Sequence, residues 1–395
     1  MANRGTVADR RVEDGRVDSS GAVTRTGTGP EGRSAVEAVG GVLERLMAEL
    51  GPQAERHGAL YGRLWEELGR AVSGGKRFRG RLVVELHDAL GGPRREAAAQ
   101  VGAAFELLHA GFLVHDDLID HDTMRRGELN LAARMGLAAR ERGAREEEAE
   151  ELAEGAAVLA GDLAISLAHR LVATVVAPPD VHARLQELVW DTVFVSVAGE
   201  LGDVAAGLGL EEVSLADALR IAAEKTAHYS FQAPLRAGAI LAGAPAELRG
   251  DVEAVGLALG KAFQLVDDLL GVFAPESVTG KSALSDLREG KATTLMLHAR
   301  ALPVWEAIRA DVGRADLDEA TAAVLRRELA RSAAPGRVAQ QARGELAAVE
   351  RLMGDSPRLA PATGVIRTVA GMVARTLEDT EVHVVAARDG LPVRK

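Results

Sequence analysis

Aspartates gather in one short segment of the sequence, residues 109–120 (HAGFLVHDDLID). On a helix, Asp116 and Asp120 lie one turn apart on the same face, with Asp117 beside them. Carboxylates clustered among apolar residues repel one another and are poorly solvated, and a divalent cation relieves both costs. An oxygen-only ligand set favours Mg²⁺. The segment therefore predicts a metal site, although a helix cap or a salt-bridged acidic face would explain this motif if it stood alone.

A second aspartate pair, Asp267 and Asp268, lies in the apolar segment 263–271, where Gln264 precedes the pair by one helical turn. Two such helices that face each other would hold a metal cluster between them. Together the two motifs favour metal binding more strongly than either motif does by itself.

Basic residues lie close to both motifs in the sequence. They are Arg125 and Arg126 after the first motif, Lys281 and Lys291 after the second, Lys225 beside Thr226, and the run 74–79 (GGKRFR) at an expected helix start. A helix start with free backbone N–H groups is a ready anion site. Each basic residue taken singly is typical of a solvated surface charge. Together with the acidic helices, they predict a pocket for phosphate-rich ligands bridged by Mg²⁺.

The elements that would position these residues are helices. The chain has 395 residues, of which 47% are hydrophobic and only 3% aromatic, and helix-forming Ala, Leu and Arg are abundant. Apolar periodicity predicts helices over about 36–50, 55–72, 78–90, 96–120, 151–175, 181–207, 214–242 and 247–272, with four more in 292–388. No strand is expected. We predict an all-α protein with one large helical bundle over residues 34–395.

The connecting segments are polar. Residues 1–33 are rich in Gly, Ser, Thr and Arg and predict a flexible N-terminal tail. Residues 127–150 end in a charge run and predict a solvated loop or exposed helix, and a loop is expected over 274–291. A helix end is expected near Gly51 and Pro52.

Charge and composition exclude several classes of function. The formal net charge is −11, which argues against a general attraction to nucleic acid or anionic lipid. The chain has no cysteine, which excludes disulfides, thiolate metal ligands and a cysteine nucleophile. The sequence shows neither a signal peptide nor an apolar run of membrane-span length, so we expect a soluble, cytoplasmic protein.

Over about residues 35–390 the sequence resembles the polyprenyl synthetase family of trans-isoprenyl diphosphate synthases. The signature regions appear in family order: 74–79, 109–120 with 125–127, Gly161-Asp162, Lys225-Thr226, and 263–268 with Gly280-Lys281 and Lys291. The resemblance implies the all-α isoprenoid synthase fold around a central cavity. It also implies a short-chain prenyl diphosphate synthase that joins isopentenyl diphosphate to an allylic diphosphate.

The resemblance assigns roles to single residues. Asp116, Asp120 and Asp267 would bind Mg²⁺, up to three ions per site, with Asp117 and Asp268 supporting them. Arg125, Lys225 and Lys291 would hold the allylic diphosphate, and Lys76, Arg79, His109 and Arg126 would hold isopentenyl diphosphate, while Lys281 is a further substrate-binding candidate. Thr226 and Gln264 would stabilise positive charge near the reacting carbons. A lone helical His is more often structural, and the position of His109 two turns before Asp116 favours the ligand role.

Two positions depart from the family pattern. Gly271 stands where many members have a third Asp, and Asp286 is a candidate to supply the missing charge. Gly80 stands where proline is common, and we expect little effect.

The expected chemistry is ionisation of the allylic diphosphate, attack by the isopentenyl double bond and loss of a proton. Product length would depend on Phe112, one turn before Asp116, because a helical turn of about 5.4 Å matches roughly one isoprene unit. Phe112 would form the floor, and Gly111 would open a gap beside it. In the family that the sequence resembles, a single large residue at this position suits C20 or C15 products, so the resemblance favours geranylgeranyl diphosphate (C20), with farnesyl diphosphate (C15) next.

Two other functions stay open. A class I terpene cyclase also ionises allylic diphosphates, but its usual Asn/Ser/Glu metal motif is not found in the sequence. A non-catalytic regulatory partner of a synthase would be expected to have lost the motifs, which look intact here. The family usually forms homodimers, and a homodimer is the expectation carried over to this chain.

Overall fold

The computed structural model describes residues 34–73, 75–275, 278 and 285–390. These residues belong to one compact unit, Ser34–Lys395. The predicted tail 1–33 and the site candidate Lys281 lie outside the described residues, as does the side chain of Asp286. The tail and the boundary at residue 34 therefore stay predictions.

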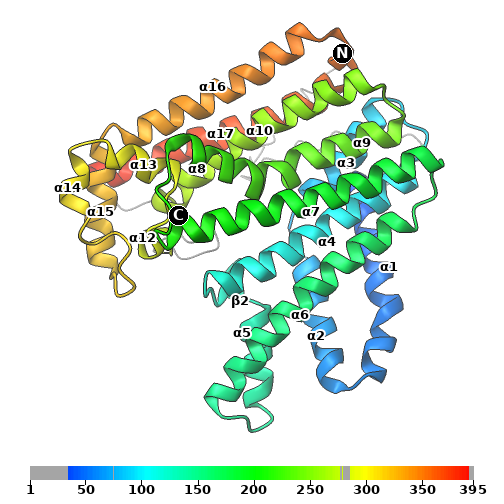
Figure 1. Cartoon of the computed structure of the whole chain (residues 1–395), viewed down its shortest axis with the longest axis horizontal. Helices are drawn as coiled ribbons and strands as arrows, with labels where there is room; N and C mark the ends of the chain where they lie inside the picture. The colour runs from blue at the N-terminus through cyan, green and yellow to red at the C-terminus, as the bar shows by residue number, and fades with distance from the viewer. Residues whose placement is uncertain (1–33, 74, 276–277, 279–284, 391–395) are drawn as a thin grey trace, which may run out of the picture. The chain divides into compact units, whose positions relative to one another are not determined.

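The first half of the unit is built of long helices and one small hairpin (Figure 1). Its elements are α1 (Ala35–Arg56), α2 (Ala59–Ser73), α3 (Phe78–Ala89), α4 (Arg95–Ile119), β1 (Met124–Arg125), β2 (Glu128–Leu129), α5 (Leu131–Arg140), α6 (Glu146–Ala173) and α7 (Pro179–Gly207).

The second half is also helical. Its elements are α8 (Leu215–Ala222), the π-helix η1 (Ala223–Gln232), α9 (Ala233–Ala242), α10 (Ala246–Phe273), α12 (Ser285–Glu289), α13 (Thr294–Arg300), α14 (Val304–Ile308), α15 (Glu319–Arg331), α16 (Ala334–Asp355), the 3₁₀-helix η2 (Pro357–Ala362) and α17 (Thr363–Asp389). The predicted all-α class is confirmed. The region after residue 292 holds five α-helices where the sequence predicted four helices.

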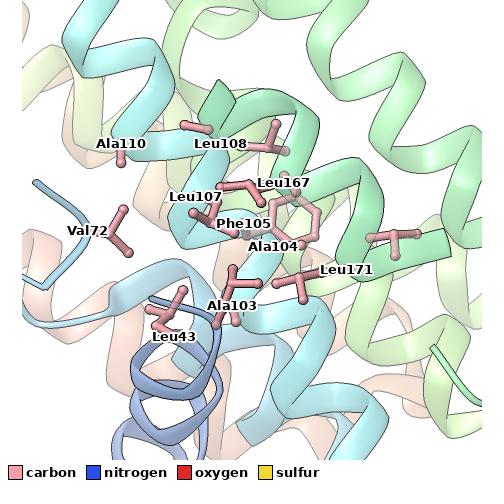
Figure 2. Packing of buried hydrophobic residues seen from close by; sticks show 14 of the residues in the cluster. Leu43, Val72, Ala103, Ala104, Phe105, Leu107, Leu108, Ala110, Leu167 and Leu171 are labelled. Atoms are coloured by element: carbon pink, nitrogen blue, oxygen red, sulfur yellow. The ribbon is translucent and has the colours of Figure 1, made fainter. Parts of the chain in front are cut away.

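Helix α4 forms the centre of the first core and packs against α6, α3 and α1. Its side chains Phe105, Leu107 and Leu108 are fully buried. They pack toward Leu167 and Leu171 of α6, as Figure 2 shows. A helix that buries apolar residues on all sides is held rigidly, so the backbone that carries the aspartates at its C-terminal end has a fixed position.

Helix α10 has the same role in the second half, where it packs against α16, α17 and η1. Its residues Leu265, Val266 and Leu269 are buried on either side of the second aspartate pair. Each aspartate motif is thus carried by a helix in the interior.

The π-helix η1 interrupts the helical stretch that the sequence predicted over 214–242. Its wider turn is accommodated by glycines on both neighbouring helices. A Cβ at Gly199 of α7 would overlap the backbone of Lys225, and one at Gly260 of α10 would overlap Ala227. At Gly256 a Cβ would lie 2.7 Å from the Cα of Gln232. π-Helical turns are rare and occur frequently at functional sites.

The segment 127–150 corrects a prediction, because it is not simply a solvated loop or exposed helix. Helix α5 buries Leu131 and Met135, and it packs against α6. Before it, β1 and β2 form a hairpin whose turn residues Arg126 and Gly127 both have positive φ, 56° and 76°. This backbone suits a two-residue hairpin turn.

Helix α1 also corrects a prediction, since it runs through Pro52 to Arg56 instead of ending near Gly51. Leu46 and Ala54 are buried on either side of the proline. Packing of this face outweighs the missing hydrogen bond of the proline nitrogen.

Two helices among the described residues are long and apolar enough to cross a membrane by length and composition alone. They are Arg95–Ile119 and Glu146–Ala173, and 78% and 50% of their most apolar windows are buried inside the protein. The core helix of a soluble protein meets the same criteria, so these helices are weak evidence for a membrane span.

Candidate active site

Asp116, at the end of α4, meets Lys225 of η1 with an Oδ1–Nζ distance of 3.1 Å. The same ammonium group lies 3.0 Å from Glu200 and 2.7 Å from Asp203, both on α7. Burial alone would lower the pKa of Lys225, but the surrounding carboxylates raise it above its usual value. Lys225 is therefore a permanent cation bound by carboxylates from two helices.

Arg125 serves the other side of the first motif. Its guanidinium contacts Asp117 closely and lies 3.2 Å from Oδ2 of Asp116. Asp117 is 5% exposed, so this charge-assisted contact compensates a buried carboxylate. The hairpin formed by β1 and β2 thus brings Arg125 back onto the helix that precedes it.

Asp120, the C-cap of α4, pairs with Lys291 at 2.8 Å, and Lys291 also lies 2.9 Å from Glu289. Burial would lower the pKa of Lys291, whereas Asp120 and Glu289 raise it overall. Two of the lysines that sequence analysis singled out, Lys225 and Lys291, therefore neutralise the first and last aspartates of the first motif.

The second motif adjoins the same segment. Asp268 is 7% exposed and accepts hydrogen bonds from the Gln264 amide and from the backbone N–H of Thr294, both at 3.0 Å. Lys291 and Thr294 are separated by at most about 10 Å of extended chain. One short stretch thus contacts Asp120 of the first motif and Asp268 of the second. Asp267 is exposed.

Positive charge gathers on the side of α4 that faces α3. Burial of His109 and the positive charges of Arg79, Arg126 and Arg125 nearby lower the pKa of its imidazole well below the usual range. A Cβ on Gly75 would lie 3.0 Å from Nη2 of Arg126, so that guanidinium lies beside the loop before α3. His109, Arg79 and Arg126 therefore form a cationic cluster suited to an anion, with the imidazole neutral.

The remaining predicted residues occupy the same neighbourhood. Lys76 is exposed in the loop that precedes α3, and Thr226 follows Lys225 in η1, half-buried. Gly80 has a structural reason, because its N–H donates to Glu106 at 2.8 Å and its backbone crosses that of Gly102 closely. Proline there would lack this donor.

Phe112 and Gly111 point in different directions. The Phe112 ring meets Tyr229 edge-to-face, with centroids 5.1 Å apart at 84°. A Cβ on Gly111 would lie 3.1 Å from the carbonyl oxygen of Gly161 and 3.2 Å from Ile165. The expected gap beside Phe112 is therefore wrong, because α6 fills the space at Gly111 and the glycine serves helix packing.

The donor set fits Mg²⁺, although the described residues hold no group of three or more His, Asp or Glu side chains that would bind a metal ion alone. Asp116 and Asp120 already direct carboxylate oxygens at cations. Mg²⁺ usually takes one or two carboxylates and completes its shell with phosphate oxygens and water. The carboxylates of the two aspartate motifs, with the segment that contains Lys291 between them, are suited to this kind of coordination.

Two cavities in the described part of the chain are lined by residues other than these side chains. One of about 380 Å³ lies between α14 and α15 and is lined by residues such as Ala307 and Ser332. The other, of about 540 Å³, adjoins the end of α7 and includes Ala292, the neighbour of Lys291. None of the lining residues belongs to the motifs, so the geometry of the charged groups carries the site.

Sequence analysis missed four residues of this site. Glu200, Asp203, Glu289 and Tyr229 each contact a residue that it singled out. Glu200 and Asp203 are three positions apart on one helix, a spacing that places two acids on the same face. Such a pair is also common on the solvated face of a helix. Only the tertiary contact with Lys225 distinguishes a pair that belongs to the site from a pair on a solvated surface.

The comparison with protein families gives one matching family model, polyprenyl synthetase, over residues 64–311. Among curated proteins, farnesyl diphosphate synthase of Mycobacterium tuberculosis is 37% identical over 188 residues, which cover 48% of this chain and 46% of that protein. Geranylgeranyl diphosphate synthase of Sulfolobus acidocaldarius is 33% identical over 211 residues, 53% of this chain and 58% of that protein. The chain thus spans about half the length of the curated relatives it matches.

Solved structures match over a longer stretch. Geranylgeranyl pyrophosphate synthase of Corynebacterium glutamicum, complexed with isoprenyl diphosphate and magnesium, has a TM-score of 0.77 and 24% identity. The match covers 90% of this chain and 98% of that one. Polyprenyl synthase of Caulobacter crescentus has a TM-score of 0.64 and 26% identity, with coverage of 91% and 99%. The predicted fold is confirmed by these neighbours.

Proposed function

The chain belongs to the polyprenyl synthetase family, and from this premise we propose that it is a magnesium-dependent prenyl diphosphate synthase. It would join isopentenyl diphosphate to an allylic diphosphate and release a longer prenyl diphosphate. The observation that carries this proposal is the short segment containing Lys291 and Thr294, which contacts both aspartate motifs.

The cations of the site supply the binding of the allylic diphosphate. Lys225, Lys291 and Arg125 are held by carboxylates in the free protein. A diphosphate offers them stronger acceptors, so each would turn toward it while remaining charged. Asp116 and Asp120 would thereby be freed to hold Mg²⁺ together with the exposed Asp267, and the bound metal would supply charge neutralisation of the leaving group.

Ionisation breaks the bond between the allylic carbon and the diphosphate oxygen. The isopentenyl double bond then attacks the allyl cation, a carbon–carbon bond forms, and the proton lost from the new chain passes to the released diphosphate. Gln264 donates its amide N–H to Asp268, which leaves its carbonyl oxygen to face the developing positive charge. Thr226 lies on the adjoining η1 and can contribute its hydroxyl oxygen.

Isopentenyl diphosphate would bind in the cationic cluster beside α3. Arg79, Arg126 and Lys76 supply charge, and neutral His109 supplies an N–H donor. Separate cationic sites for two diphosphates keep the substrates in a defined relative orientation. Phe112 is proposed as the floor of the chain pocket, which favours a C20 or C15 product.

The proposal extends to a homodimer in the cytoplasm. Four exposed apolar residues of α7, Trp190, Phe194, Val197 and Leu201, recur at helical spacing, and Phe194 is 64% exposed. Val158 and Leu159 of the adjoining α6 are exposed as well. An apolar stripe of this kind suits a second copy of the chain. Sedimentation of the Phe194→Glu variant as a monomer would support the dimer, and an unchanged mass would exclude this face.

The decisive test is product analysis. Purified protein with Mg²⁺ and labelled isopentenyl diphosphate is incubated with each of the C5, C10 and C15 allylic diphosphates, and products are identified by mass spectrometry. Incorporation of the label into a longer diphosphate is expected, and chelation of the metal should abolish it. A cyclic hydrocarbon without label would indicate a terpene cyclase, and no product at all would favour a regulatory partner.

A further inference from the structure

Tyr229 contacts two residues that the resemblance assigns to isopentenyl diphosphate and the residue expected to limit product length, yet no motif singles it out. It lies in η1, is 7% exposed, and contacts Arg79 of α3 together with His109 and Phe112 of α4. We propose that Tyr229 is a specificity-determining residue that joins the isopentenyl diphosphate site to the floor that limits product length. The inference rests on the proposed function of the same site.

The hydroxyl of Tyr229 orders the isopentenyl diphosphate side. Arg79 Nη2 donates to this oxygen at 3.3 Å and to Ser230 Oγ at 2.7 Å, and the guanidinium lies 4.7 Å from the ring centroid. The hydroxyl lies 3.4 Å from Nδ1 of His109. Because burial and nearby arginines keep the pKa of His109 low, Nδ1 can accept this proton and Nε2 carries the ring hydrogen. Tyr229 thus directs both Arg79 and an N–H of His109.

The ring of Tyr229 serves the other side. Its edge-to-face contact with Phe112 fixes the plane of a ring that is only half-buried by the core. Gly111, the preceding residue on α4, has no side chain and is packed against α6, so it cannot take over this function. A Phe112 ring without its partner could turn aside and admit a longer chain.

The backbone of Tyr229 is itself held in place. Lys225 and Ala227 lie against Gly199 and Gly260 of the neighbouring helices, and Ser230 receives the hydrogen bond from Arg79. Because η1 cannot shift easily, the contacts of Tyr229 connect two substrate regions through one rigid side chain.

Two variants separate the two roles. Tyr229→Phe keeps the ring and removes the hydroxyl, so KM for isopentenyl diphosphate should rise about tenfold while the product length stays unchanged. Tyr229→Leu removes the ring as well, so the product distribution should also shift to longer prenyl diphosphates. Tyr61→Phe is the matched control, because Tyr61 is the chain's only other tyrosine and is 37% exposed. It should change neither quantity.

A double variant tests whether Tyr229 acts through Phe112. Phe112→Ala alone should lengthen the product, and Tyr229→Leu added to it should lengthen the product no further. If Tyr229→Leu lengthens the product as much in the Phe112→Ala background as in the wild type, Tyr229 does not act through Phe112 and the proposal is overturned. An unchanged KM for isopentenyl diphosphate in Tyr229→Phe would overturn it as well. If Tyr229→Leu fails to fold, judged by circular dichroism, the KM and product length of Tyr229→Phe still decide the first role. Wild-type protein that makes no product from isopentenyl diphosphate would instead refute the proposed function.

Discussion

The two aspartate motifs differ in what holds their carboxylates. In the first, Asp116 and Asp120 are bound by the side-chain cations Lys225 and Lys291. In the second, the donors that reach Asp268 from the described residues are neutral, the Gln264 amide and the Thr294 backbone, while Asp267 is exposed. A lysine side chain can leave a carboxylate and bind a diphosphate instead. The hydrogen bond from the backbone N–H of Thr294 to Asp268, in contrast, holds the backbone after Lys291 in one position. The first motif is therefore arranged to rearrange on binding, and Asp268 is arranged to keep the Lys291 segment in place.

Replacement of Asp116 by Asn should give the largest effect. The variant keeps the shape of the side chain but removes the charge shared by Lys225 and Arg125, so kcat should fall by about 10³-fold. Asp180→Asn, an exposed position in the first turn of α7, is the control and should retain wild-type kcat. Steady-state kinetics with a saturating allylic diphosphate measures both. A loss smaller than tenfold at Asp116 would contradict its place at the centre of the site.

Replacement of Gly260 by Ala tests whether α10 holds the catalytic lysine in place. The added methyl would overlap Ala227, so stability should fall by about 1–3 kcal/mol and kcat should fall with it. Gly250→Ala is the matched control on the same helix, since its Cβ would meet nothing within 4 Å. That change should raise stability by up to about 1 kcal/mol. Urea unfolding measures both, and equal effects would refute the tight contact.

Alanine at Asp268 and at Asp267 should separate structure from chemistry within the second motif. Asp268→Ala leaves the buried N–H of Thr294 without its acceptor, which should cost about 1–3 kcal/mol of stability. Asp267→Ala removes an exposed side chain and should change stability by less than about 0.5 kcal/mol, while kcat falls. Paired denaturation and activity measurements decide this. The reverse order of stabilities would show that the two aspartates have exchanged roles.

The smallest effect concerns pH and the helix of the first motif. The pKa of His109 is lowered in the folded protein, so below about pH 6.5 the unfolded chain binds a proton that the native protein does not. Native stability is therefore retained above that pH and lost below it, by up to about 1.4 kcal/mol per pH unit. His109→Asn should lose less stability on acidification of the substrate-free protein. His57→Asn, at an exposed position, should behave like wild type, and indistinguishable curves for all three would reject a lowered pKa.

The carriers of both motifs could be predicted from the sequence because apolar periodicity is strong there. The bounds expected for α3, α4, α7 and α10 agree with the structure within a residue or two. Pro52 misled the prediction for α1, because a local signal for a helix end was outweighed by the buried face that continues past it. The amphipathic α5 was hidden by the charge run that follows it, which dominates the composition of the segment.

The sequence predicted the site residues that belong to recognisable motifs, but not the residues that reach them only through tertiary packing. The motif aspartates and Lys225 were identified from residue type and spacing, but Glu200 and Asp203 become recognisable only when α7 packs against η1. The gap expected at Gly111 was wrong for a similar reason. A glycine beside Phe112 fits either an open pocket or a close helix crossing, and the neighbour Gly161 lies 50 positions farther along the chain.

The ten residues of η1 are wound more loosely than an α-helix, as the bond from the N–H of Ala233 to the carbonyl of His228 indicates. The direction in which each η1 side chain points around the helix axis therefore depends on the number of residues in the segment. Deletion of a single residue between Lys225 and Tyr229 would change the angle between these two side chains around the helix axis. A substitution in η1 changes one side chain at a time, whereas a change in its length would alter the positions of Lys225 and Tyr229 relative to each other.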